Sequence, residues 1–377
     1  MRMFQLIFIF SAVLIFGTNN SKAELASKAE MDLVCQNWLT QIVHEQGNWA
    51  GQANPKVIRV EEFRSGDTLL ATIHHIDPTG FILIPVLKEM VPIKAYSDKY
   101  NLDENQENGF ITLIRELFSS YLNIYVDNYG SLNQRQSIDN QIFDPKQKDE
   151  WNRLLQPSNE FKSSLLETRD RDAVEVGPLL TTSWHQKYPY NINSPIGSGG
   201  ICDAGCVATA MAQILKHWEW PPRGSSNYTY YWGGDYSCGE PYTSGEFVTA
   251  DLTNDYDWAN MPDSCDLGCS TAEVEALAEI NFEAGVACRM QYGHCNSSAW
   301  HLGGSVEAYQ KHFCYSREIQ TAYRGDFTQE EWYQIIKEEI DNNRPIHYGI
   351  SGHSIACDGY RDDGFGLYRY HLNYGWG

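Results

Sequence analysis

A cysteine stands at the start of a strongly patterned segment that ends before Pro221. Cys206 follows Gly205, and the apolar residues after it recur with the helical period, forming a stripe of Val207, Met211, Ile214, Leu215 and Trp218. Free backbone N–H groups and the positive end of the helix dipole stabilise a thiolate in the first turn of a helix. The segment therefore predicts a nucleophilic cysteine on a buried helix. The structural alternatives are an inert buried thiol and a disulfide between Cys206 and Cys202.

The C-terminal part of the sequence supplies a base for this thiol. Strand-like runs lie on both sides of Gly352-His353-Ser354. A thiol attacks efficiently only as the thiolate, so we expect Cys206 and His353 to form a thiolate–imidazolium pair. His347 and His371 are competing bases, but the two small residues that flank His353 favour it.

Two further groups complete the expected site. We expect Asn373 to accept the His353 N–H and to hold the imidazole in its useful tautomer, although an Asn in a turn is the alternative. The backbone N–H of Cys206 is the expected first donor of an oxyanion hole. Gln320 and the glycine-rich loop at residues 197–205 are the candidates for its second donor.

Residues 1–23 have the pattern of an export signal. Arg2 precedes an apolar stretch at residues 4–16, and Ser21 and Ala23 are the small residues that a signal peptidase requires, so we expect cleavage after Ala23. The stretch is too short to span a membrane comfortably, which disfavours an uncleaved anchor. No later segment has a membrane-spanning length of apolar residues. We therefore expect a secreted protein, extracellular or periplasmic, without stable membrane insertion.

The cysteine content fits an oxidising compartment. The sequence has 10 cysteines, of which Cys35 lies in the N-terminal part and nine lie after residue 200. Setting Cys206 aside leaves eight of those nine, so four disulfides beside one reactive thiol are expected. A zinc site at Cys265-x-x-x-Cys269 is a weaker alternative, because no matching second pair follows. We expect no metal and no cofactor.

The charge excludes one class of partner. The formal net charge of the 377 residues is -21. Such a chain repels phosphates, so general electrostatic binding of nucleic acid is not expected. The acidic balance otherwise indicates solubility and says little about the fold.

The patterning divides the chain into two parts. In the first part we expect a helix at residues 24–52, strands at 57–63, 68–74 and 80–91, and a helix at 110–121. Residues 133–160 are weakly patterned, and the charged run at 167–172 indicates an exposed linker that proteases can cut. From Gly177 the composition changes. There we expect helices at 271–283 and 328–342 and strands at 345–351, 355–360 and 367–374, with Thr328 and Glu331 forming a capping box.

Several short motifs in the second part resemble those of the streptopain family of secreted bacterial cysteine proteases, peptidase family C10. The matching stretches are Gly177–Trp184, Gly205–His217, Asp257–Pro262, Glu283–Val286, Asn343–Tyr348, Gly352–Ser354 and His371–Gly377. They occur in the family's order and cover the chain from about Gly177 onward. Residues 80–100 are more loosely similar to the family's inhibitory prodomain.

The resemblance implies both a fold and an activity. It implies an α+β architecture, with a papain-like two-lobed protease domain at residues 177–377 and an α+β inhibitory propeptide at 24–176 behind the signal peptide. Family members usually continue past the position of Gly377, so we expect either a fragment or a member without the last strands. It further implies a secreted cysteine endopeptidase made as a zymogen, acting on proteins or peptides and inhibited by its own propeptide.

The resemblance also assigns roles to individual residues. It makes Cys206 the nucleophile and His353 the base, and it matches Trp376 to the family tryptophan that packs beside the catalytic histidine. Tyr374 stands where the family more often has a second tryptophan. Two other functions use the same residues: a transglutaminase-like Cys–His acyltransferase, and a surface-binding homologue that has lost catalysis.

Overall fold

The architecture was analysed in a computed structural model that describes residues 4–7, 25–103, 109–129, 145–167, 173–238, 242–364 and 366–376. The chain forms two compact units. The first unit contains the described residues of 1–11, 174–362 and 368–377, and the second contains those of 12–173 and 363–367. The expected cleavage site after Ala23 and most of the charged run at 167–172 lie outside the described residues.

The second unit consists of one antiparallel sheet and four helices. The sheet has the order β2-β3-β4-β5, from strands Val57–Ser65, Thr68–Ile76, Phe81–Pro85 and Ala95–Ser97. The helices are α1 (Lys28–Gln46), α2 (Gly109–Tyr129), α3 (Pro145–Leu154) and α4 (Ser158–Glu167). A capping box of Ser27 and Glu30 starts α1, and Gly47 with a φ of 81° ends it, so the helix is shorter than the predicted 24–52.

Helix α3 lies within residues 133–160, where the sequence pattern was weak, and α4 begins at the end of that stretch. Each has only ten residues, too few for a clear apolar stripe. Large buried side chains hold them instead: the Trp151 indole donates a hydrogen bond to the Met90 carbonyl oxygen at 2.8 Å, and Phe161 is fully buried. Tertiary packing rather than local pattern therefore specifies these helices.

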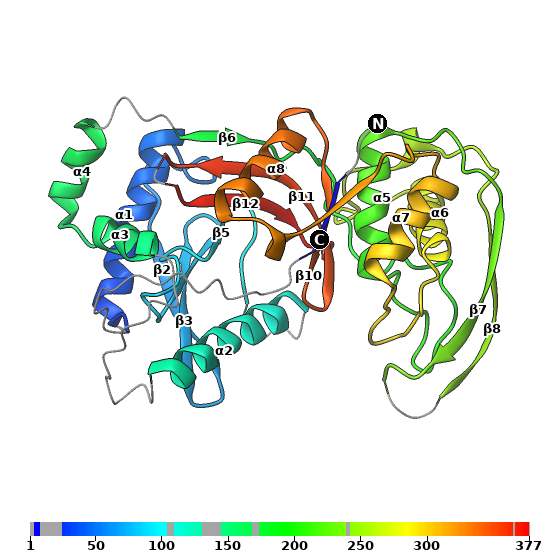
Figure 1. The fold of residues 1–377 in the computed structure, drawn as a ribbon, viewed down its shortest axis with the longest axis horizontal. Coiled ribbons are helices and arrows are strands. Elements are labelled where there is room, and N and C mark those ends of the chain that lie inside the picture. Colours follow the sequence, from blue (N-terminus) through cyan, green and yellow to red (C-terminus); the bar gives the residue numbers. More distant parts are fainter. Residues whose placement is uncertain are drawn as a thin grey trace. The chain divides into compact units, whose positions relative to one another are not determined.

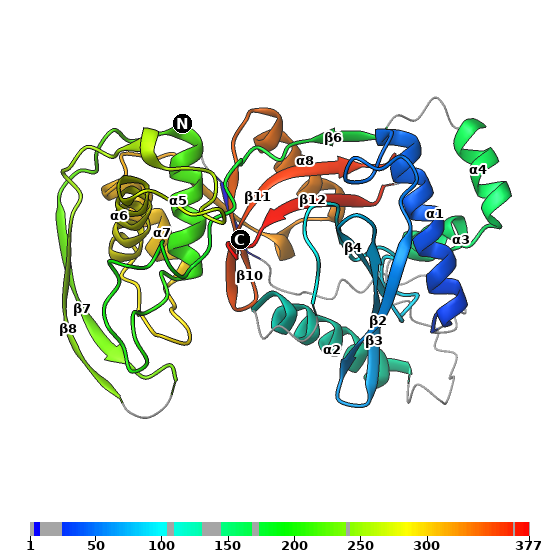
Figure 2. The same ribbon diagram turned by 180° about the vertical axis from the view of Figure 1, so that it is seen from behind.

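The first unit has two lobes, each with its own apolar core. The helical lobe contains α5 (Cys206–Trp218), α6 (Thr271–Ala287), α7 (His301–Lys311) and the two-stranded ribbon of β7 (Asn227–Asp235) and β8 (Thr243–Asp251). Figure 1 shows the three helices gathered together, and Figure 2 shows the long ribbon beside them. The ribbon and α7 were not predicted. Gly303 and Gly304 interrupt the pattern of α7, which explains that omission.

The sheet lobe contains the three C-terminal strands of the chain, β10, β11 and β12. Its strand order is β12-β11-β10-β1-β9, from Tyr368–Asn373, His353–Asp362, Ile346–Ile350, Phe4–Ile7 and Gln320–Tyr323, and β6 (Val174–Val176) also pairs with β11. Strands β10, β11 and β12 are antiparallel neighbours, as the expected strands and reversals predicted. Helix α8 (Gln329–Asp341) packs on β10 and β11, and its predicted capping box of Thr328 and Glu331 is confirmed. The α+β fold class is thereby confirmed.

The cysteines form fewer disulfides than expected. Cys238 bonds Cys295, and Cys265 bonds Cys269, so the alternative of a zinc site at that last pair is wrong. The prediction of four disulfides is also wrong, because Cys202, Cys288 and Cys357 are buried thiols in apolar surroundings and Cys314 is an exposed thiol. Burial raises the pKa values of the Cys202 and Cys288 thiols to about 12. Within the described parts of the chain, no helix has the length and apolarity needed to cross a bilayer.

One buried carboxyl group lies in the core of the helical lobe. Glu283 on α6 is 4% exposed, and the Tyr256 hydroxyl donates to its Oε2 at 2.5 Å. Burial raises the pKa of Glu283 to about 8. Because the folded-state pKa lies above that of the unfolded chain, the group's contribution to stability is complete below the unfolded pKa. It is lost as the pH rises through the folded pKa.

We therefore expect Glu283→Gln to flatten the pH dependence of stability. The melting temperature of the unchanged chain should fall as the pH rises from about 5 to about 8, because only the unfolded state ionises freely there. The melting temperature of the variant should fall less over this pH range, so the variant should be more stable than the unchanged chain at about pH 8. Glu275→Gln, on an exposed position of the same helix, is the control. Parallel melting curves for Glu283→Gln and the unchanged chain would contradict the assignment.

Candidate active site

The backbone before Cys206 explains why a glycine precedes it. Gly205 has a φ of 91°, a conformation that L side chains rarely adopt. A Cβ atom there would lie 2.5 Å from Cε of Met290. Only glycine therefore lets the chain enter α5 at this point. Cys206, the first residue of the helix, is half-buried at the edge of the helical lobe's core.

Three backbone N–H groups lie near enough to the Cys206 thiol to oppose the rise in its pKa. They belong to Ser354 of β11, to Val207 and to Cys206 itself. The last two are the unpaired donors of the first helical turn, as the sequence pattern implied. The donor from Ser354 brings β11 of the sheet lobe against the thiol. Cys206 thus lies where the two lobes of the first unit meet.

His353 is the first residue of β11 and follows Gly352, which has a φ of 72°. Its Nε2 donates to the Tyr374 carbonyl oxygen at 2.9 Å. The Trp376 indole packs edge-on against the imidazole, with ring centroids 4.7 Å apart and planes at 65°. A carbonyl oxygen only accepts hydrogen bonds, so the neutral ring carries its proton on Nε2, and Nδ1 is its acceptor nitrogen.

Asn373 does not take the position that was expected of it. Its Nδ2 donates to the Thr182 carbonyl oxygen at 2.7 Å and to Gln213 Oε1 at 2.9 Å, and its Oδ1 accepts from the Gly375 N–H at 3.0 Å. The expected hydrogen bond from His353 to Asn373 is therefore wrong, because the Tyr374 carbonyl oxygen accepts that proton. Asn373 instead holds the turn that carries this carbonyl.

The sequence analysis missed Gln213, which is fully buried on α5 two turns after Cys206. Its Oε1 accepts from the Thr182 hydroxyl at 3.0 Å and from the Trp184 N–H at 3.2 Å, in addition to Asn373. Its Nε2 donates to Asn373 Oδ1 at 3.2 Å. A glutamine between Ala212 and Ile214 in an otherwise apolar helix was the available signal, since buried amides need several partners.

In this structure the thiol and the imidazole both favour their neutral forms. Burial raises the pKa of Cys206, and the three N–H donors only partly oppose that effect. Burial lowers the pKa of His353 to about 4, against the opposing effect of the bond to the Tyr374 carbonyl. Burial thus disfavours the charged form of each group, and the thiolate–imidazolium pair stays a prediction.

The other two histidines are engaged elsewhere. His347 is fully buried on β10, with its Nε2 2.6 Å from the Ser354 hydroxyl. His371 on β12 has its Nδ1 2.5 Å from Oδ1 of the buried Asp358. Gln320 is exposed at the start of β9, and within the described part of the chain no hydrogen bond joins it to Cys206. The structure thus gives no support to Gln320 as an oxyanion donor.

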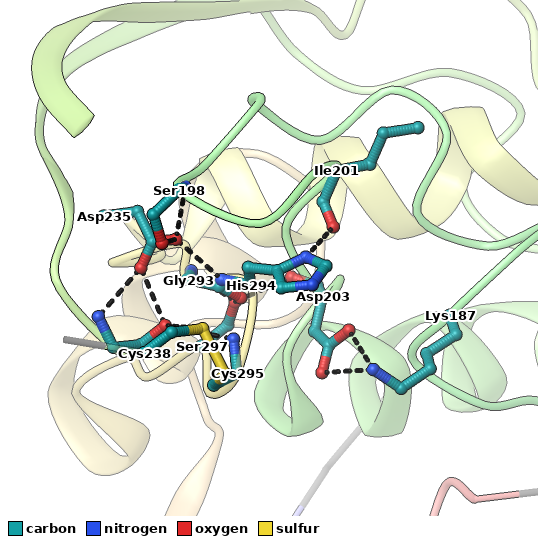
Figure 3. The surroundings of a disulfide bond; sticks show 11 residues. Lys187, Ser198, Ile201, Asp203, Asp235, Cys238, Gly293, His294, Cys295 and Ser297 are labelled. Carbon is teal, nitrogen blue, oxygen red and sulfur yellow. Dashed lines mark hydrogen bonds and ion pairs between the residues drawn. A yellow bond between two sulfur atoms is a disulfide. The ribbon is translucent and has the colours of Figure 1, made fainter. Parts of the chain in front are cut away.

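The glycine-rich loop before Cys206 is held by a buried carboxylate. Asp235 accepts five hydrogen bonds, from the N–H and hydroxyl groups of Ser198 and Ser237 and from the His294 N–H (Figure 3). Burial alone would raise the pKa of Asp235, but these bonds outweigh it and hold the pKa well below its usual range. The Cys238–Cys295 disulfide joins the segments of Ser237 and His294, which Asp235 also connects.

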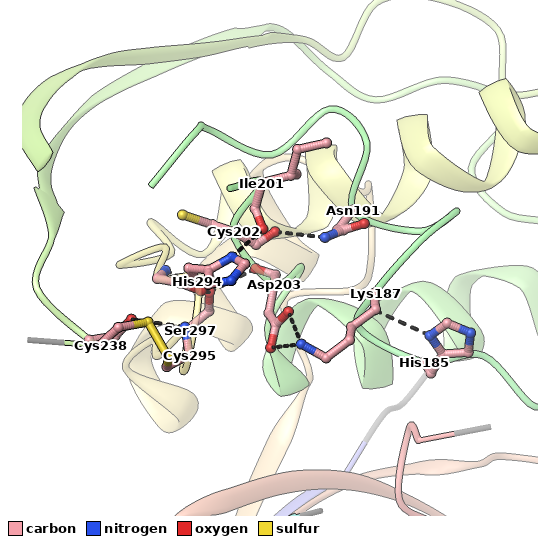
Figure 4. Close-up of polar contacts among 12 residues, drawn as sticks. His185, Lys187, Asn191, Ile201, Cys202, Asp203, Cys238, His294, Cys295 and Ser297 are labelled. Atoms are coloured by element: carbon pink, nitrogen blue, oxygen red, sulfur yellow. Dashed lines mark hydrogen bonds and ion pairs between the residues drawn. A yellow bond between two sulfur atoms is a disulfide. The ribbon is translucent and has the colours of Figure 1, made fainter. Parts of the chain in front are cut away.

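The C-terminal end of the loop has its own contacts, shown in Figure 4. The Asn191 side chain donates to the Cys202 carbonyl oxygen at 3.0 Å, and His294 Nδ1 donates to the Ile201 carbonyl oxygen at 3.1 Å. The Asp203 N–H donates to the Gly293 carbonyl oxygen, and the Ala204 N–H donates to that of Gln186. These last two amides are therefore already engaged within the fold.

Comparison with known proteins identifies relatives of this chain. The profile of the peptidase C10 family matches residues 184–377. The thiol protease/hemagglutinin PrtT of Porphyromonas gingivalis is 32% identical over 231 residues, which cover 60% of the chain and 25% of PrtT. Streptopain of Streptococcus pyogenes serotype M1 is 25% identical over 87% of the chain and 77% of its own length. The chain thus spans about a quarter of the first relative and most of the second.

A solved structure extends the similarity to the fold. A fragment of Prevotella intermedia prointerpain A, in which one cysteine is mutated to alanine, superposes with a TM-score of 0.59 at 25% identity. The match covers 84% of the chain and 88% of that fragment, so it extends well beyond the residues that the family profile matches. Because the profile covers more than half of the sequence and includes both Cys206 and His353, the chain belongs to the peptidase C10 family.

Proposed function

We propose that the chain is a secreted cysteine endopeptidase made as an inactive precursor, with Cys206 as nucleophile and His353 as base. The observation that carries this proposal is the closeness of the two residues: the N–H of Ser354, which follows His353 on β11, lies near enough to the Cys206 thiol to lower its pKa, while the Tyr374 carbonyl oxygen and the Trp376 indole hold the His353 ring. The family of cysteine peptidases to which the chain belongs supports hydrolysis over transfer to an amine or loss of catalysis. Proteins or peptides would be the substrates.

The proposed reaction follows from the tautomer of His353. The ring donates from Nε2 to the Tyr374 carbonyl oxygen, so Nδ1 would receive the thiol proton when the sulfur attacks the peptide carbonyl. The imidazolium would then protonate the leaving amine, and water would hydrolyse the thioester by the same groups. The backbone N–H of Cys206 would stabilise the oxyanion. Trp376 would cover the imidazole and restrict its rotation.

We assign the domains accordingly: a signal peptide at residues 1–23, an inhibitory propeptide at 24–176 and the catalytic domain at 177–377. The boundary between the compact units lies between Ala173 and Val174, three residues before the proposed start of the catalytic domain. Val174–Val176 form β6, which pairs with β11, and Glu175 forms an ion pair with Arg361 at 2.8 Å. These contacts favour a cut a few residues before Gly177, so that the mature enzyme would keep β6, the last three residues of the segment assigned to the propeptide.

Replacing the nucleophile tests the proposal most directly. Cys206→Ala should lower peptide hydrolysis by about 10⁴-fold or more and should leave the precursor at its full mass, because both steps need the sulfur. Intact mass spectrometry and turnover of a peptide library measure the two effects. Cys314→Ala, which removes an exposed thiol, is the control and should process normally. Self-cleavage by the Cys206→Ala chain would reject Cys206 as the nucleophile.

The position of maturation is a second prediction. We expect the cut between Glu167, the last residue of α4, and Val174, the first residue of β6, so that both of these elements stay intact. N-terminal sequencing of the mature form gives the position. A new N-terminus at Leu179 or later would show that β6 is removed and that its pairing with β11 is not kept.

Replacing Trp376 tests the proposed cover of the imidazole. Because burial lowers the pKa of His353, Trp376→Ala should raise that pKa from about 4 toward the ordinary value of a histidine, and should lower turnover. Trp376→Phe retains a ring and should give an intermediate pKa. The measurement is an NMR titration of the His353 ring in the Cys206→Ala background, which prevents self-cleavage. Identical titration curves for the alanine variant and its parent would reject the role of the indole.

A further inference from the structure

A series of four hydrogen-bonded polar side chains, three of them buried and His301 half-buried, includes Ser354, the residue that follows His353. The Ser354 hydroxyl is 2.6 Å from His347 Nε2 and 2.9 Å from His301 Nδ1. The other nitrogen of His347, Nδ1, lies 3.2 Å from the Tyr309 hydroxyl. The two imidazoles meet edge to face, with centroids 4.9 Å apart and planes at 85°. Nothing in the proposed chemistry requires these groups.

The chain of hydrogen bonds joins the two lobes of the first unit. His301 and Tyr309 belong to α7 of the helical lobe, whereas His347 and Ser354 belong to β10 and β11 of the sheet lobe. Tyr309 and His347 are fully buried, and Ser354 is 2% exposed. A buried hydrogen bond across two elements has few alternative partners, so it fixes their relative position more tightly than apolar contact does.

Ser354 connects this chain to the reacting groups. Its backbone N–H lies near enough to the Cys206 thiol to lower the pKa of that thiol, and its preceding neighbour in the sequence is His353. Its hydroxyl is held from both sides, so the peptide unit that faces the sulfur cannot turn without breaking two buried hydrogen bonds. Loss of such a bond leaves a buried nitrogen unsatisfied, and native structures rarely leave buried polar groups in that state.

We propose that Ser354, held between His301 and His347, is a positioning residue that keeps its N–H aimed at the Cys206 sulfur and the His353 ring beside it. The inference rests on the proposed roles of Cys206 and His353. Its effect is geometric, since a displacement of about 1 Å in reacting groups is enough to slow an enzyme by about 10²-fold. His301 and His347 act through Ser354 and touch no substrate.

The protonation states agree with this role. Burial lowers the pKa of His301 to about 4, with a further contribution from His353, and burial lowers the pKa of His347 well below its usual range. Neutral imidazoles each offer one donor and one acceptor, which a chain of hydroxyl groups and rings can satisfy in sequence. The titratable groups around the chain are His353 from β11, Cys206 from α5, Cys288 at the end of α6 and Tyr315 after α7.

The test measures the reactivity of Cys206 without relying on peptide hydrolysis. The full-length chain is treated with iodoacetamide from about pH 5 to about pH 9, and the peptide that carries Cys206 is quantified by mass spectrometry. Cys314, an exposed thiol, is an internal reference in the same sample. Ser354→Ala should slow alkylation of Cys206 about tenfold and shift its pH profile, while the rate at Cys314 stays unchanged.

Variants at His301 separate positioning from folding. His301→Asn places an amide near the position of Nδ1, so this variant should keep most of the unchanged protein's pH profile of Cys206 alkylation. His301→Phe offers no polar atom there and should reproduce the effect of Ser354→Ala. His312→Asn removes a buried histidine at the other end of the same helix. This residue does not belong to the hydrogen-bonded series, so the alkylation profile of Cys206 should stay unchanged. Should Ser354→Ala fail to fold, the comparison of the two His301 variants gives the same answer.

The outcomes are distinct. A Ser354→Ala protein with a lower melting temperature but an unchanged alkylation profile of Cys206 would overturn the inference. The hydrogen bonds of Ser354 would then serve only the stability of the fold. Equal profiles for His301→Asn and His301→Phe would overturn it as well. If the unchanged chain hydrolyses no peptide, the proposed function fails, yet the alkylation profiles still decide whether Ser354 positions Cys206.

Discussion

The pair of amides formed by Gln213 and Asn373 is the interaction on which the geometry of the site depends. Gln213 lies on α5, the helix that begins with Cys206, and Asn373 ends β12. Their two mutual hydrogen bonds connect the nucleophile's helix to the turn whose carbonyl orients His353. Gln213 is fully buried, so each amide group would be costly to leave unpaired. The position of His353 therefore depends on α5, the helix that begins with Cys206, through the hydrogen bonds of Gln213 and Asn373.

The same site shows how burial and reactivity oppose each other. Exclusion of water strengthens the hydrogen bonds that aim the groups, but it also disfavours the charges that the reaction needs. Cys206 and His353 both favour neutrality here, with the pKa of the imidazole lowered to about 4.

The sequence predicted those parts of the molecule that local pattern specifies. The helix after Cys206, the capping box at Thr328 and the strands around His353 depend on periodicity and turn residues. The role of Asn373 was mistaken because its partner, Gln213, is 160 positions away and only tertiary packing brings the two together. The number of disulfides was mistaken because counting cysteines ignores the apolar environment that keeps Cys288 and Cys357 as thiols. The hydrogen bonds of Ser354 with His301 and His347 could not be predicted for the same reason, because tertiary packing brings their segments together.

Two interactions of different chemistry hold the region around the glycine-rich loop: the hydrogen bonds of Asp235, two of which come from Ser198 of the loop, and the Cys238–Cys295 disulfide beside them. Reducing surroundings, which protect a thiol nucleophile from oxidation, also favour reduction of the Cys238–Cys295 bond. Asp235 makes its five hydrogen bonds without any redox chemistry. Its carboxylate also stays ionised in acid, because those bonds hold its pKa well below the usual range. The loop can therefore keep its shape in surroundings that are both reducing and acidic.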